Sequence, residues 1–165
     1  MGTVLILLME PRGDDGRRVT AVSNVKVIGG HVGDYGGLST RLAEQGSFGA
    51  SVDGLGDLDG DGTPDLAVGS VGPGGQHIPQ RMGIVFIILL KPDGSVKREQ
   101  LISQQHEGGL KGPSVLGDYF GSALTTLVER GQSEEGVVTL VVGAKMDNNR
   151  DWAEDGGAVY ILTCK

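Results

Sequence analysis

Short apolar runs alternate with glycine-rich polar turns along the chain. Three of these runs follow a glycine and share one pattern, namely Gly2-Thr3-Val4-Leu5-Ile6-Leu7, Gly83-Ile84-Val85-Phe86-Ile87-Ile88 and Gly157-Ala158-Val159-Tyr160-Ile161-Leu162. Apolar runs of about four to eight residues bounded by glycine, proline or aspartate are typical of β-strands. The pattern therefore predicts an all-β chain with an internal repeat.

The repeat has two further landmarks. Residues 48–51 (FGAS) match residues 120–123 (FGSA), and residues 66–69 (LAVG) match residues 140–143 (LVVG). A complete unit contains a Phe-Gly strand, a polar turn, an apolar strand, a long loop, a second apolar strand, a Pro/Gly turn and a more polar strand. Four strands repeated in tandem predict β-propeller blades. A two-sheet sandwich with coincidental similarity is the alternative.

The polarity of each strand predicts its place in the blade. Near-continuous apolar runs such as residues 84–90 predict strands that are covered on both faces. Residues 96–102 are more polar and include Lys97 and Arg98, which predicts an outer edge strand whose charges oppose edge-to-edge pairing.

These motifs resemble the FG-GAP repeat of integrin α-subunit β-propellers. The complete pattern comprises Phe48-Gly49, Leu55-Gly56-Asp57, Asp59-Gly60-Asp61-Gly62, Asp65-Leu66-Ala67-Val68-Gly69 and Gly83-Ile84-Val85-Phe86. The resemblance implies four-stranded antiparallel blades, about two and a quarter per chain. We expect residues 1–30 to form the last two strands of a preceding blade, residues 31–103 a complete blade with a calcium loop, and residues 104–165 a second, three-stranded blade without that loop.

The acidic turn at residues 57–65 has the spacing of a cation-binding loop. Asp57, Asp59, Asp61 and Asp65 occupy positions 1, 3, 5 and 9, and the carbonyl of Thr63 is available at position 7. Calcium takes about six to eight hard oxygen ligands, and alternate side chains around a glycine turn can converge on it. Residues and resemblance both predict a structural Ca²⁺ site. The alternatives are a solvated acidic turn without metal and a magnesium site.

Two other acidic segments lack this spacing. Residues 129–136 (ERGQSEEG) correspond to the calcium loop but have no alternating aspartates and include Arg130, so we expect no ion there. Residues 145–156 contain several acidic side chains whose spacing fits no recognised ion loop. We expect a solvated hairpin loop, with a second ion or a ligand-facing surface as alternatives.

Composition and charge narrow the class of protein. The 165 residues carry a formal net charge of −7, which argues against nucleic-acid binding because such binders need clustered basic side chains. The apolar run at residues 84–90 is far shorter than the ~20 residues that cross a bilayer, so no membrane span is expected. Residues 3–9 lack the basic flank of a signal peptide and are expected to form a strand.

The remaining motifs are weaker. Arg12-Gly13-Asp14 spells an integrin-binding tripeptide but falls at a predicted turn, and we expect it to be turn chemistry. Trp152 is expected to cover its own loop. The three histidines, His31, His77 and His106, lie in glycine-rich loops without metal-ligand spacing. No nucleophile elbow or phosphate-binding loop occurs, so we expect no enzyme.

The function that these features predict is that of a calcium-stabilised propeller segment of a cell-surface or secreted protein, which binds a protein or glycan ligand. By analogy with integrin α-subunits, the ligand-binding loops are residues 29–47, 70–82, 103–118 and 145–156. An accessory module of an extracellular hydrolase and a purely structural surface repeat are the alternatives.

The number of strands raises a question of assembly. Propellers usually close with about four to eight blades, more than this chain supplies. We expect either a fragment of a longer chain or a homo-oligomer. In the oligomer, a trimer, the two N-terminal strands would complete the three-stranded blade of a neighbouring copy.

Overall fold

The computed structural model describes residues 2–12, 19–29, 35–40, 42, 46–72, 83–103, 119–127, 137–145 and 156–164. Within these ranges the regular structure is nine β-strands and the short 3₁₀ helix η1 (Tyr35–Gly37), so the predicted all-β class is confirmed. The strands are β1 (Thr3–Arg12), β2 (Val19–Gly29), β3 (Phe48–Gly56), β4 (Asp65–Ser70), β5 (Ile84–Leu90), β6 (Val96–Ile102), β7 (Phe120–Leu127), β8 (Val138–Ala144) and β9 (Ala158–Cys164). The described residues contain no helix of the length and hydropathy needed to cross a membrane.

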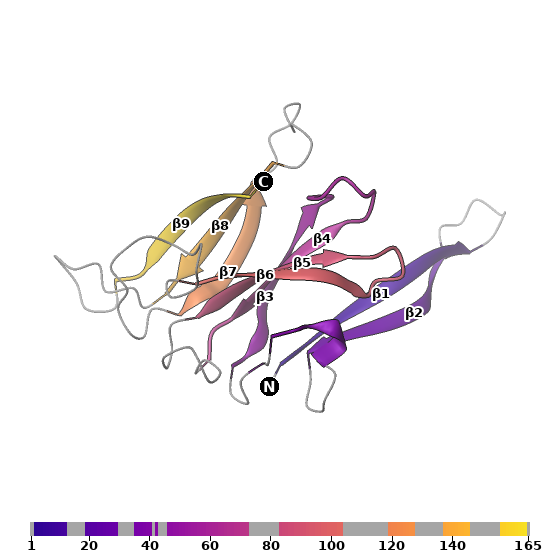
Figure 1. Ribbon diagram of the computed structural model, residues 1–165, viewed down its shortest axis with the longest axis horizontal. Coiled ribbons are helices and arrows are strands. Elements are labelled where there is room, and N and C mark those ends of the chain that lie inside the picture. Colours follow the sequence, from indigo (N-terminus) through magenta and orange to yellow (C-terminus); the bar gives the residue numbers. More distant parts are fainter. Residues whose placement is uncertain are drawn as a thin grey trace.

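The strands form three antiparallel sheets in chain order. They are the N-terminal sheet (β1-β2), the central sheet (β3-β4-β5-β6) and the C-terminal sheet (β7-β8-β9). Figure 1 shows the central sheet between the other two. Sheets of two, four and three strands are the arrangement expected of propeller blades. The predicted unit boundaries after residues 30 and 103 fall in or beside segments outside the described ranges and stay predictions.

The central sheet has the strand polarity predicted from the sequence. All of β5 is buried except Leu89, which is partly exposed, because neighbouring sheets cover both faces of this strand. β6 lies at the sheet edge, where Lys97 and Arg98 are exposed. The apolar run and the charged edge strand were therefore placed correctly by their sequence patterns.

Two apolar cores join the three sheets. In the first, Val4 and Ile28 of the N-terminal sheet pack with Val68, Phe86 and Ile88 of the central sheet. In the second, a different set of central-sheet side chains packs against the C-terminal sheet: Leu55, Ala67, Val85 and Ile87 meet Phe120, Leu140 and Val142. Each face of the central sheet therefore belongs to a separate core.

The Phe-Gly motif produces the same local structure in both sheets. Gly49 and Gly121 have φ values of 83° and 86°, a region that side chains disfavour, and the strand register shifts at both places. The two phenylalanines make equivalent edge-to-face contacts, Phe48 with Phe86 at 5.2 Å and Phe120 with Tyr160 at 5.3 Å. The sequence repeat is therefore also a repeat of packing.

Candidate metal site

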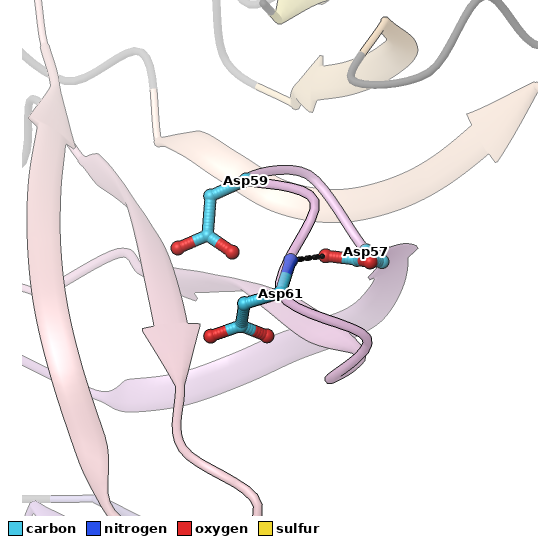
Figure 2. A group of neighbouring side chains, drawn as sticks. All are labelled: Asp57, Asp59 and Asp61. Carbon is cyan, nitrogen blue, oxygen red and sulfur yellow. Dashed lines mark hydrogen bonds between the residues drawn. The ribbon is translucent and has the colours of Figure 1, made fainter.

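The turn between β3 and β4 gathers three carboxylates. Asp57, Asp59 and Asp61 each place one ligand oxygen within 4.8 Å of the other two. Figure 2 shows the three side chains around the turn, with the amide of Asp61 donating to the Asp57 carboxylate. The sequence spacing 1, 3, 5 therefore does bring these three aspartates together.

Backbone amides hold the turn in this shape. The Asp57 carboxylate accepts hydrogen bonds from the amides of Asp61 (3.0 Å) and Gly62 (2.7 Å), and Asp61 Oδ1 accepts one from the amide of Thr63 (2.9 Å). Gly62 has φ 84° with open space where a Cβ would lie, so it reverses the chain without steric cost. The turn thus fixes Asp57 and Asp61 through its own backbone.

A lysine from the outer strand neutralises part of the charge. Lys97 Nζ on β6 lies 2.8 Å from Asp59 Oδ2 and 2.5 Å from Asp61 Oδ2. The hydrogen bond from Lys97, with smaller contributions from Thr63, holds the pKa of Asp61 below its usual value. The same bonds to Asp59 and Asp61 raise the pKa of Lys97. Two of the three carboxylates therefore share one ammonium group.

Asp65 has a different role in the described structure. It is fully buried at the start of β4, where Oδ2 accepts from the amide of Leu58 and Oδ1 from the amide of Leu90, both at 2.9 Å. Burial raises the pKa of this carboxyl although both hydrogen bonds lower it. Asp65 connects the acidic turn to the end of β5 and is not part of the group of three. That Asp65 binds the metal ion stays a prediction.

The donor set fits a hard divalent cation. Asp57, Asp59 and Asp61 offer carboxylate oxygens at the surface around a glycine turn, and carboxylate oxygens are a ligand type that calcium takes. Thr63 is buried beside them, with its amide bound to Asp61. The ammonium of Lys97 lies against two of these carboxylates, so a cation that binds all three has to compete with it.

Sequence reasoning missed two features of this site. Lys97 was identified only as an edge charge, and its 36-residue separation from Asp61 gives no local signal of contact. Asp65 was treated only as a ligand, although a carboxylate that leads directly into an apolar strand is itself a signal of burial with backbone partners.

Several predicted features lie outside the described residues. They include the whole segment 129–136 with Glu129 and Arg130, most of the four expected ligand-binding loops, and the residues His31, His77, His106 and Trp152. The Arg12-Gly13-Asp14 motif also falls beyond the described range after Arg12.

Comparison with known proteins gives one informative similarity. No family model matches the chain. A stretch of 107 residues, 65% of this chain, is 35% identical to Integrin alpha-5 from Xenopus laevis, and it covers 9% of that protein. The chain thus spans about a tenth of the length of this relative. The similarity is weak, and it points in the same direction as the FG-GAP-like motifs and the three antiparallel sheets.

Proposed function

We propose that this chain is a calcium-binding, FG-GAP-like β-propeller segment with a non-catalytic role in adhesion. The convergence of Asp57, Asp59 and Asp61 on a glycine turn carries the calcium assignment. The similarity to Integrin alpha-5 supports the adhesion assignment and, with it, a location outside the cell or at its surface.

Calcium is structural in this proposal. Asp57, Asp59 and Asp61 hold the ion, together with the Thr63 carbonyl and Asp65 as predicted ligands. The carboxylates lie between β3 and β4, two strands of one packed sheet, so a bound cation relieves their mutual repulsion and stabilises the hairpin. Because the unfolded chain lacks this grouping, binding free energy adds to folding free energy.

A calcium titration of thermal unfolding tests the proposal. Extracellular calcium modules bind with a Kd of ~10⁻⁴–10⁻³ M, and free calcium at ~100 times Kd adds about 2.7 kcal/mol to the free energy of unfolding. We expect the melting temperature to rise with calcium and to rise less with equal magnesium. Identical melting curves in excess calcium and excess chelator, with metal analysis showing the chelated protein to be empty, would contradict the assignment.

The adhesion role needs a separate measurement. Immobilised, calcium-loaded protein is exposed to an array of extracellular-matrix proteins and to an array of glycans. We expect calcium-dependent retention on at least one member of these arrays. Uniform lack of binding, in protein that passes the calcium test, contradicts adhesion and leaves the structural-repeat alternative.

A further inference from the structure

A short segment between β2 and β3 is packed against the sheets. It comprises residues 35–40 and 42, begins with η1, and is here named the strap. Leu38 and Leu42 of the strap are 7% and 5% exposed and lie in the core between the N-terminal and central sheets. The strap belongs to the loop at residues 29–47, which the sequence assigned to ligand binding. Part of that loop is therefore a packed element.

Two glycines bring the strap against both neighbouring sheets. Gly36 has φ 65°, and a Cβ at this position would lie 2.1 Å from the carbonyl oxygen of Val27 on β2. Gly37 has φ 90°, and its Cβ would lie 3.3 Å from the Cβ of Val96 on β6. Side chains disfavour both backbone conformations. The strap therefore lies directly on a strand of each sheet, and Figure 1 shows η1 beside β2.

Glu99 of β6 fastens the strap to the central sheet. Its Oε1 accepts hydrogen bonds from the Ser39 hydroxyl (2.8 Å) and the Thr40 amide (2.6 Å), and its Oε2 accepts one from the Ser39 amide (3.1 Å). Hydrogen bonds to a carboxylate are about twice as strong as those between neutral groups. One side chain of the edge strand thus binds two backbone amides and a hydroxyl of the strap.

The sheet itself does not depend on this carboxylate. Glu99 is partly exposed, and β6 pairs with β5 through its backbone, with Glu99 opposite Ile88. Val96 and Leu101 of the same strand pack against the first core through their own side chains. Removal of the carboxylate should therefore free the strap without separating the strands of the central sheet.

We infer that Glu99 is a positioning residue for the loop at residues 29–47. It holds the strap in place, and the fixed strap divides the loop into two shorter segments with less conformational freedom. A loop that is ordered before it binds loses less entropy when a ligand is bound. The effect of Glu99 on ligand binding rests on the proposed adhesion function, whereas its effect on the strap does not.

Hydrogen exchange measured by NMR tests the effect on the strap. In Glu99→Ala, we expect the amides of Ser39 and Thr40 to exchange at least about tenfold faster, because each loses its acceptor. Amides of β4 and β5, which pair within the sheet, should keep their rates. Glu99→Gln keeps one acceptor oxygen and should show a smaller increase. Gln100→Ala, at an exposed position of the same strand, is the matched control and should exchange like the unmodified protein.

An affinity measurement tests the effect on ligand binding. The calcium-loaded variants are titrated against the matrix protein or glycan of the arrays that retains the unmodified protein. We expect Glu99→Ala to bind about three- to tenfold more weakly, because binding must then order the loop. Gln100→Ala should bind like the unmodified protein.

Other outcomes contradict the inference. Unchanged exchange at Ser39 and Thr40 in Glu99→Ala would show that Glu99 does not hold the strap. Exchange that rises equally in the strap and in β4 and β5 would show a loss of global stability and not a positioning role. Unchanged affinity in a variant whose strap exchanges faster would separate the strap from ligand binding. If the unmodified protein binds no array member, the adhesion proposal fails and the ligand effect with it, whereas the exchange rates still decide whether Glu99 holds the strap.

Discussion

The β3–β4 and β7–β8 hairpins share their strands but differ in the turn between them. Both begin with Phe-Gly and a register shift, and both return with a Leu-x-Val-Gly strand that packs in an apolar core. Val68 of the first strand lies in the core between the N-terminal and central sheets, and its equivalent Val142 lies in the core between the central and C-terminal sheets. The first hairpin has buried Asp65 before that strand, where the second has the partly exposed Thr139. The comparison shows that the packing of the strands tolerates both turns, so the acidic turn adds something that packing does not require.

The largest effect should come from the buried carboxylate. Asp65→Ala leaves the amides of Leu58 and Leu90 without their acceptor in a buried setting, and each lost acceptor costs about 1–3 kcal/mol. We therefore expect the free energy of unfolding in chelator to fall by about 2–4 kcal/mol in total, and by more in calcium because Asp65 is also a predicted ligand. Urea denaturation in chelator measures this change.

Two further variants test whether the loss of stability in Asp65→Ala comes from the lost hydrogen bonds. Asp65→Asn keeps one acceptor oxygen and should lose roughly half as much stability as Asp65→Ala. Thr139→Ala, at the equivalent position of the C-terminal sheet, should change the free energy of unfolding by less than ~1 kcal/mol. An Asp65→Ala protein as stable as the unmodified one would remove the distinction between the two hairpins.

The second-largest effect should be on the stability that calcium adds, which we expect to depend on the β3–β4 turn and not on the β7–β8 turn. Asp59→Ala removes one carboxylate from the group of three and should abolish most of the calcium-dependent gain of about 2.7 kcal/mol at ~100 times Kd. Glu129→Ala, in the corresponding segment of the second unit, should leave that gain intact. Calorimetric titration and melting curves, each with and without calcium, measure both variants. A calcium response lost in Glu129→Ala and kept in Asp59→Ala would place the ion elsewhere.

Much of the fold was readable from the sequence because the repeat fixes several features at once. The glycine before each apolar run placed β1, β5 and β9, the Phe-Gly motif placed β3 and β7, the Leu-x-Val-Gly match placed β4 and β8, and the polar character of residues 96–102 placed β6 at the outer edge. The remaining strand, β2, followed from the resemblance, which implied two strands in residues 1–30. The grouping of Asp57, Asp59 and Asp61 was also readable, because a glycine turn brings alternate residues together locally. Local pattern was sufficient wherever the partners lie close in sequence.

Contacts between residues that are far apart in the sequence could not be predicted from it. The contact of Lys97 with Asp59 and Asp61 depends on the strand order β4-β5-β6, which carries β6 past the turn. The bond from the Leu90 amide to Asp65 spans 25 residues and depends on the exact end of β5. Residue spacing predicts neither contact, so the sequence identified Lys97 only as an edge charge and Asp65 only as a metal ligand.

A smaller effect should follow from replacing the lysine that competes for the turn. Lys97→Met removes the ammonium from Asp59 and Asp61, so an incoming calcium ion no longer displaces an existing ion pair. We expect calcium affinity to increase about three- to fivefold, in keeping with the modest strength of exposed ion pairs. Isothermal titration measures the change, and Arg98→Met, an exposed neighbour on the same strand, is the control. Unchanged affinity in Lys97→Met would show that the lysine does not compete with the ion.

The smallest effect should be a pH dependence of the stability that the ion pair between Lys97 and Asp61 contributes. Lys97 lowers the pKa of Asp61 from its model-compound value of 3.8, so the folded state favours the ionised carboxylate. This contribution to stability is present above about pH 4 and decreases as the pH falls through the lowered pKa, because protonation then removes the bond to Lys97. In chelator, the melting temperature of the unmodified protein should exceed that of Lys97→Met at pH 6, and the two should converge toward pH 2. A difference that stays constant over this range would mean that Lys97 stabilises the turn through packing of its aliphatic chain and not through the Asp61 carboxylate.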